Sequence, residues 1–341
     1  MYKRQTVNGT VALHAALWAL GLGKGDEVIT TSFSFAASSN AILFVGAKPV
    51  FVDIDARTYN IDPEKIEEKI TNKTKALLIV HLYGQPCEMK KITKVCRQHG
   101  LILIEDAAQA HGAEYNGRKV GTFGDVACFS FYATKNITTG EGGMVITKKK
   151  GLYELVRMIV NQGQRKKYEH VILGHNFRMT EMQAAIGLEQ LKHLDEWNRK
   201  RIKNAKFYDE KLKEVDDVVT PFVMPNVKHV YHQYVIRAKK RDRLQQYLLK
   251  KGIQTAVHYP KPIYKQSLYQ KLGFKLKLPE VERAANEVLS LPVHPLVAKR
   301  DLEKIVNEIK KFWVNSNTDT AKQVLEEMKK FRKKPKQLLE P

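Results

Sequence analysis

Lys135 lies between an apolar, strand-like segment and a glycine-rich turn, in the stretch CFSFYATKNITTGEGG. Upstream, the apolar segment LILIED ends in Asp106. A lysine that follows a buried strand is partly desolvated, so the pKa of its amine falls and the amine attacks an aldehyde more readily. A carboxylate at a strand end needs a cation or a donor as partner, and a protonated pyridine nitrogen is such a cation. The pair therefore indicates chemistry that depends on pyridoxal phosphate.

Each of these residues also has an ordinary alternative. Asp106 alone could cap a following helix, and a single lysine in a chain with 58 Lys and Arg residues is more often a surface residue. Phe35, at the end of a predicted strand, could stack on a pyridine ring or pack in the core. Gln109, on the loop after Asp106, is suited to hydrogen-bond the phenolic oxygen of the same cofactor.

A phosphate group could bind where Asn8, Gly9 and Thr10 precede a helical pattern. The start of a helix presents free backbone N–H groups, and Thr10 adds a hydroxyl. Taken alone, the tripeptide is read more simply as an Asn-Gly turn with a threonine cap. Ser130, near Lys135, could supply a second hydroxyl or be a buried hydroxyl of its strand.

Apolar runs alternate with helical patterns in the first half of the chain. A strand and its following loop are expected over 26–35, further strands over 49–54, 76–83, 101–106, 126–132 and 143–147, and helices over 11–22, 63–71 and 88–100. Continuous apolar strands separated by amphipathic helices predict an α/β fold, with a mainly parallel mixed sheet covered by helices on both faces. In such sheets the ligand binds at the carboxyl ends of the strands, where Asp106 and Lys135 fall.

The second half predicts a smaller C-terminal α+β domain. One or two long helices over 180–215 are followed by a strand over 229–238, a helix over 241–252 and a helix ending near Trp313. We place the large domain at 1–195, the small domain with its linking helix at 196–315 and a basic tail at 316–341. A short amphipathic helix is expected in the tail, with Val324, Leu325, Met328 and Phe331 on one face, followed by KKPK.

Composition restricts the classes of protein that remain. The chain has 341 residues and a formal charge of +22, but Lys and Arg are scattered among Glu, so a nucleic-acid partner is not expected. The sequence holds neither a run long enough to span a membrane nor a secretory signal, and a cytoplasmic location is expected. Three cysteines without CxxC spacing, and histidines without HExxH pairing, indicate no metal site.

Several motifs in a fixed order resemble the DegT/DnrJ/EryC1/StrS aminotransferases, which are fold-type I enzymes that use pyridoxal 5'-phosphate to transaminate keto sugars, usually on nucleotide carriers. The motifs include VNGTVALHAAL, IEDAAQAHGA, FSFYATKNITTGEGGMV, GHNFRMTEMQAAIGLEQL and VHYPKPIY, and the similarity spans Val7 to about Trp313. The resemblance implies an enzyme that moves an amino group, with glutamate as the expected donor, onto the ketone of a nucleotide-linked sugar.

The resemblance also implies roles for individual residues. Lys135 would be the Schiff-base lysine, and Asp106 the partner of the pyridinium nitrogen. The other cofactor-binding positions and their expected contacts are Gln109 near the phenolic oxygen, Phe35 on the ring face, and Gly9, Thr10 and Ser130 around the phosphate. Asn176, in GHNFRM, would reach the phosphate of the neighbouring subunit's cofactor, which implies a homodimer with shared active sites. His258 and Tyr259 would border the sugar site.

The chain departs from the family pattern at its start. Family members carry several tens of residues before the VNGT segment, whereas MYKRQ stands here, so an N-terminal truncation is expected. Two alternatives follow from these features. The chain could be a non-catalytic basic binding protein on a truncated aminotransferase scaffold, or it could belong to the deoxygenating dehydratase branch, in which histidine replaces the lysine.

Overall fold

The large sheet positions the ends of the strands that carry Asp106 and Lys135. The computed structural model describes the backbone of residues 1–332 and the side chains of residues 1–315. Seven strands are ordered β1-β9-β8-β5-β4-β2-β3. Their bounds are β1 Tyr2–Thr6, β2 Glu27–Thr31, β3 Lys48–Val52, β4 Thr74–Val80, β5 Ile102–Asp106, β8 Val126–Ser130 and β9 Gly143–Thr147. Pairing is parallel from β8 to β3, whereas β9 is antiparallel to both neighbours, which confirms the mainly parallel mixed sheet.

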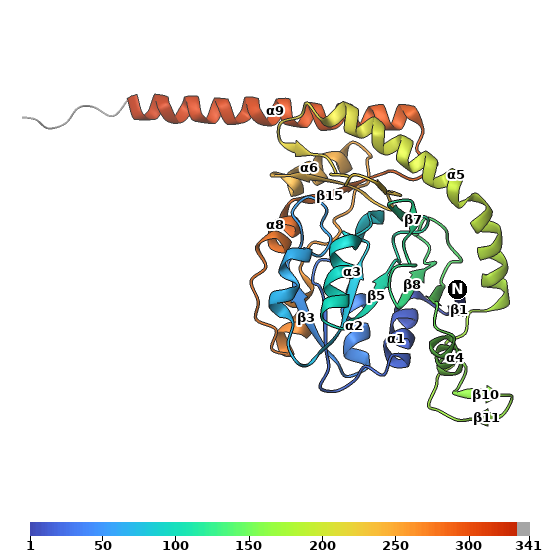
Figure 1. The fold of residues 1–341 in the computed structure, drawn as a ribbon. Coiled ribbons are helices and arrows are strands. Elements are labelled where there is room, and N and C mark those ends of the chain that lie inside the picture. The colour runs from blue at the N-terminus through green and yellow to red at the C-terminus, as the bar shows by residue number, and fades with distance from the viewer. Residues whose placement is uncertain (333–341) are drawn as a thin grey trace, which may run out of the picture.

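Helices cover both faces of this sheet, as the continuous apolar strands predicted (Figure 1). Alternate residues of β4 show the two faces: Leu78 packs in the cluster with α1 and α2, and Leu77 packs in the cluster with α3. The covering helices are α1 Gly9–Ala19, α2 Ala37–Phe44, α3 Met89–Gln98 and α4 Lys150–Ile159. Because both faces are buried, the apolar pattern of the strands shows no alternation with polar residues.

The helix expected over 63–71 is wrong. The segment forms two short 3₁₀ turns, η1 Pro63–Lys65 and η2 Glu67–Lys69. Asp62 accepts a hydrogen bond from the backbone N–H of Glu64, and Ile66 is fully buried between the turns. A nine-residue segment with two apolar side chains buries too little surface to offset the cost of starting an α-helix, so short turns are favoured.

The smaller α+β unit comes from the second half of the chain. The long pattern over 180–215 is one helix, α5 Glu181–Leu212, which begins with a capping box formed by Thr180 and Gln183. α5 runs along the large sheet and reaches the small unit (Figure 1). The small unit contains a three-stranded sheet, β12-β14-β15, and two covering helices. Their bounds are β12 Val218–Val219, β14 Tyr234–Ala238, β15 Val288–Leu291, α6 Arg241–Lys250 and α9 Lys299–Arg332.

Shorter elements complete the described chain. They are β6 Glu114–Tyr115, β7 Arg118–Lys119, β10 Gln164–Lys166, β11 Glu169–His170, β13 Val227–Lys228, η3 Leu82–Gly84, η4 Ile263–Lys265, α7 Ser267–Lys271 and α8 Pro279–Glu287. Buried residues of α7 and α8 pack in the same cluster as the large sheet, although they lie between β14 and β15 in the sequence. The domain limits at 195 and 315 stay a prediction.

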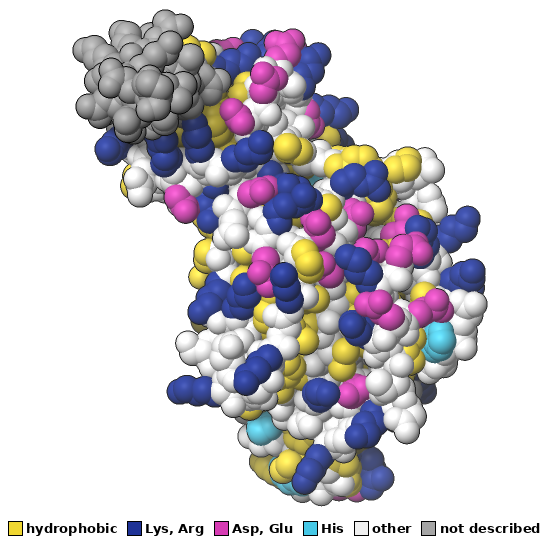
Figure 2. Space-filling model, turned by 90° about the vertical axis from the view of Figure 1, so that its left-hand side faces the viewer, with side chains coloured by type: hydrophobic (Ala, Val, Ile, Leu, Met, Phe, Trp, Pro, Cys, Tyr) yellow, Lys and Arg dark blue, Asp and Glu magenta, His cyan; other side chains and the backbone are white. Residues whose placement is uncertain are grey.

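The C-terminal helix and the charged surface bear on two sequence predictions. The backbone of α9 is helical without a break from Lys299 to Arg332, so the expected tail helix continues α9, which extends beyond the body (Figure 1). The KKPK segment lies outside the described residues. Lys and Arg are scattered among Asp and Glu over the face drawn in Figure 2. Within residues 1–332 no helix is both long and apolar enough to cross a membrane.

Candidate active site

The carboxylate of Asp106 lies buried at the carboxyl end of β5, as predicted. The Ser38 hydroxyl donates to Asp106 Oδ2 at 2.7 Å, and the Ala108 backbone N–H donates to Oδ1 at 3.1 Å. Burial raises the pKa of Asp106, and the two hydrogen bonds and the positive charge of Lys135 oppose that increase. Sequence reasoning missed Ser38, because it comes from a different segment with no motif of its own. The site therefore holds a buried acid that a nearby cation would stabilise.

The residue before Asp106 fixes the end of β5. Glu105 is fully buried and accepts hydrogen bonds from His81 Nε2 at 3.0 Å and from three backbone N–H groups. The backbone donors are Gly121 at 2.7 Å, Phe123 at 2.7 Å and Gly124 at 2.6 Å. Burial favours a higher pKa for Glu105, but these donors outweigh it and hold the pKa below its usual value. The His81 backbone N–H also donates to the Asp106 carbonyl at 3.0 Å, so this network restrains Asp106.

Lys135 follows β8, the strand that pairs with β5. Its backbone N–H donates to the Tyr132 carbonyl at 2.9 Å, which closes a tight turn after the strand. Burial lowers the pKa of the Lys135 amine, and the negative charge of Asp106 partly opposes this effect. The two predicted catalytic residues therefore interact electrostatically across adjacent strand ends. A less basic amine has a larger neutral fraction near neutral pH, and the neutral form is the nucleophile.

The start of α1 lies against the end of β8, where the sequence predicts a phosphate site. A Cβ atom at Gly9 would lie 2.7 Å from Ser130 Cβ, so glycine permits this approach and a larger residue would not. The Asn8 side chain accepts from the Val11 N–H at 2.9 Å. The N–H groups of Gly9 and Thr10 have no acceptor in the described part of the chain. Gly9, Thr10 and Ser130 thus meet at one place and offer donors suited to a dianion.

Gln109 and Tyr259 are in contact although 150 positions separate them in the sequence. Gln109 Oε1 accepts from the Tyr83 N–H at 2.8 Å, and Nε2 donates to the Tyr259 hydroxyl at 3.1 Å. His258 Nδ1 lies 2.8 Å from the Ser290 hydroxyl, and the Tyr83 hydroxyl donates to the His258 carbonyl. The structure therefore brings the predicted loop with His258 and Tyr259 to the loop that follows Asp106. Tyr83 holds both and was missed from the sequence.

Two predicted residues are less closely tied to the others. Phe35 has 62% of its surface exposed and its ring lies 6.3 Å from that of Tyr259, so core packing is excluded for it. An exposed ring beside the site remains able to stack on a bound ligand. Asn176 is exposed, forms an isolated bridge with Asn161, and makes no hydrogen bond with the other predicted site residues within residues 1–315.

These residues fit pyridoxal phosphate. Asp106 offers an acid for the ring nitrogen, Lys135 an amine for the aldehyde, and the Gly9–Ser130 approach a place for the phosphate. His111 is a further buried group that interacts with Lys135. Burial and the positive charge of Lys135 lower the pKa of His111 to about 3. Neither ring nitrogen of His111 has a hydrogen-bond partner among the described residues. Among those residues no group of three or more His, Cys, Asp or Glu side chains could hold a metal ion.

Comparison with known proteins gives consistent matches over most of the chain. Residues 4–310 match the DegT/DnrJ/EryC1/StrS aminotransferase family. A pleiotropic regulatory protein of Geobacillus stearothermophilus is 49% identical over 90% of this chain and 83% of its own length. A dTDP-3-amino-3,6-dideoxy-alpha-D-galactopyranose transaminase of Aneurinibacillus thermoaerophilus is 43% identical over 89% of this chain and 84% of its own. The structure of Bacillus subtilis NtdA with bound cofactor PMP is 34% identical, with a TM-score of 0.85, over 92% of this chain and 73% of that one.

Proposed function

The chain belongs to the DegT/DnrJ/EryC1/StrS aminotransferase family, and from this premise we propose that it transfers an amino group from glutamate to the ketone of a nucleotide-linked sugar. The transaminase relative is named for a dTDP-linked amino sugar, which supports a nucleotide-linked acceptor. The observation that carries the proposal is the buried Asp106 at the end of β5 and the half-buried Lys135 in the turn after β8, whose charges interact across these two paired strands. Lysine at this position disfavours the dehydratase alternative, in which histidine is expected.

We assign pyridoxal 5'-phosphate as the cofactor, in agreement with the PMP-bound neighbour. When bound, it supplies an electron sink for the negative charge that develops on the reacting carbon. Asp106 holds a proton at the ring nitrogen, and Gln109 Nε2 is a donor for the phenolic oxygen. Gly9, Thr10 and Ser130 bind the phosphate, and Phe35 covers a ring face. The Lys135 amine acts first as a nucleophile and then carries a proton at Nζ.

The same site must accept two substrates in turn, because the amino donor gives up its nitrogen in one half-reaction and the sugar receives it in the other. We propose that His258 and Tyr259 border the sugar. Both lie on a loop held by Ser290, Tyr83 and Gln109, so the loop is rigid enough to select a substrate.

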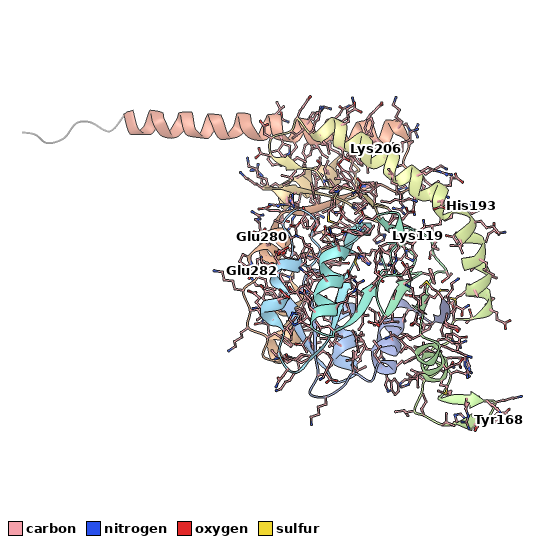
Figure 3. All side chains as sticks on the ribbon, in the orientation of Figure 1. Lys119, Tyr168, His193, Lys206, Glu280 and Glu282 are labelled. Atoms are coloured by element: carbon pink, nitrogen blue, oxygen red, sulfur yellow. The ribbon has the colours of Figure 1, made fainter. Side chains whose placement is uncertain are left out.

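We further propose a homodimer in which Asn176 reaches the partner's cofactor. The segment from the β10–β11 hairpin to the first half of α5 exposes a series of large apolar side chains, and Tyr168 projects from the hairpin away from the sheet (Figure 3). The most exposed are Tyr168, Leu173, Met182, Leu188 and Leu191. Large apolar side chains exposed together are typical of a protein–protein interface, and Asn176 lies in this segment of the sequence.

Replacing Leu188 by aspartate tests the homodimer. Leu188 is 68% exposed in the single chain, so the variant should fold, but a buried carboxylate in the interface would be unpaired. We expect the dissociation constant, measured by analytical ultracentrifugation, to rise at least about 100-fold, equivalent to roughly 2.7 kcal/mol. Leu296→Asp, at a site 86% exposed on the small unit, is the matched control and should leave the constant unchanged. A wild-type protein that sediments as a monomer contradicts the proposal.

The proposed reaction is tested with a panel of acceptors. The purified protein is incubated with pyridoxal phosphate, glutamate and dTDP-, UDP- or GDP-linked keto sugars, and mass spectrometry follows the amino sugar and 2-oxoglutarate. We expect both products with at least one acceptor, and neither when glutamate is omitted. Borohydride reduction followed by peptide mapping reports separately on Lys135. A labelled Lys135 without any amino sugar would exclude these acceptors, whereas a label elsewhere, or none, would overturn the proposed function.

A further inference from the structure

The residue after Lys135 is a buried amide whose hydrogen-bonding groups are all used. Asn136 Nδ2 donates to Asn198 Oδ1 at 2.8 Å and to the Val230 carbonyl at 3.1 Å. Its Oδ1 lies 3.3 Å from His232 Nδ1. Because the amide oxygen only accepts, His232 carries its proton on Nδ1 in this contact. Asn136 is 3% exposed and His232 is 5% exposed, so water does not replace these bonds.

Asn198 extends the same network to the loop that follows Asp106. It is fully buried on α5, and its Nδ2 donates to the His111 carbonyl at 2.8 Å. The approach is close, since a Cβ atom at Gly112 would lie 2.9 Å from Asn198 Nδ2. Asn136 and Asn198 therefore join four segments: the Lys135 turn, α5, residues 229–232 and residues 109–112.

We propose that Asn136 and Asn198 form a positioning pair that holds the Lys135 turn against α5 and keeps the lysine amine facing Asp106. This inference rests on the proposed function of Lys135. Asn136 is adjacent to Lys135, and its buried side chain joins this turn to α5, in addition to the Thr138 N–H that donates to Gln190 Oε1 at 3.2 Å. A buried network in which every polar group is satisfied restricts its segments to one arrangement, because an unpaired amide would cost about 1–3 kcal/mol.

The electrostatic surroundings of Lys135 make this positioning measurable. The charged and titratable groups that interact with the amine are Asp106, His111, His232 and His258. Arg201 of α5 acts on His232 in addition. Burial lowers the pKa of the amine, so a loosened turn that admits water should raise that pKa toward the ordinary lysine value.

Alanine variants test the pair. Reductive methylation of the cofactor-free protein over a range of pH, read by peptide mass spectrometry, gives the midpoint for labelling Lys135. We expect Asn136→Ala and Asn198→Ala to move the midpoint to higher pH. Asn204→Ala is the matched control, because Asn204 is also buried on α5 but donates to the Val293 and His294 carbonyls at 3.4 and 3.1 Å. It should lower stability and leave the midpoint unchanged.

The outcomes separate this inference from the proposed function. The positioning role would be overturned if Asn136→Ala and Asn198→Ala both label Lys135 with the wild-type midpoint, or if Asn204→Ala shifts that midpoint by the same amount. If Asn136→Ala does not fold, Asn198→Ala decides alone, because alanine favours the helix and Asn136 keeps its bonds to Val230 and His232. Failure of the proposed function is read in the wild-type protein instead, as the absence of a borohydride-stable pyridoxyl group on Lys135.

Discussion

Lys135→Ala is expected to lower the rate of amino transfer at least about 10²–10⁴-fold, the range that a positioned acid–base group supplies. The variant loses the nucleophilic amine and the group that carries a proton at Nζ, while Asp106, Ser38 and Gly9 stay in place. Binding of the phosphate and the ring should therefore persist, so the loss should appear in kcat more than in KM. Assays of amino sugar formation, stopped at fixed times and run at saturating glutamate, measure this loss of rate.

Lys150→Ala is the control for that experiment. Lys150 is exposed at the start of α4, so its removal changes the net charge by the same amount without touching the site. We expect its rate to equal that of the unaltered chain. A Lys135→Ala protein that retains more than about a tenth of the rate would assign the reaction to another amine, because the acid–base contribution of a true catalytic lysine exceeds that factor.

The sequence predicts the site chiefly where a strand end carries the functional residue. β5 and β8 are continuous apolar runs, so both are recognisable, and the carboxyl ends of neighbouring parallel strands must lie together. This geometry brings Asp106 toward the turn that follows β8 and carries Lys135. Gly9 and Ser130 meet for the same reason, since α1 begins where β8 ends.

The remaining contacts depend on tertiary structure that periodicity does not encode. Ser38 donates to Asp106 across 68 positions of sequence, and Asn136 donates to Asn198 across 62. The sequence positions of Ser38, Asn136 and Asn198 form no recognisable motif. Their partners are set by the way α2 and α5 pack in the folded chain. The helix predicted over 63–71 is wrong for a physical reason that local propensity does not include: the segment buries too little apolar surface to offset the cost of starting an α-helix.

Buried neutral histidines should make the cofactor-free protein sensitive to acid. Burial lowers the pKa of His111 and His229 to about 3 from the reference value of 6.5, and lowers that of His232 well below the same value. In the unfolded chain these groups take up protons as the pH falls through 6.5, but the folded state resists protonation. Stability is therefore fully present above about 6.5 and is lost as the pH falls toward about 3, with three protons contributing up to about 4 kcal/mol per pH unit.

His111→Phe is expected to reduce that slope by about one third, or roughly 1.4 kcal/mol per pH unit, as measured by urea unfolding between pH 6 and pH 4. The substitution is suited to the site because the His111 ring already lies 5.3 Å from Phe129 and 5.6 Å from Phe131. Its ring nitrogens have no partner to lose in the described part of the chain. His99→Phe, at an exposed position, should leave the slope unchanged. Since general protonation of carboxylates affects all three proteins alike, an unchanged slope in His111→Phe would mean that His111 takes up its proton as readily in the folded state as in the unfolded chain, which contradicts a pKa lowered by burial.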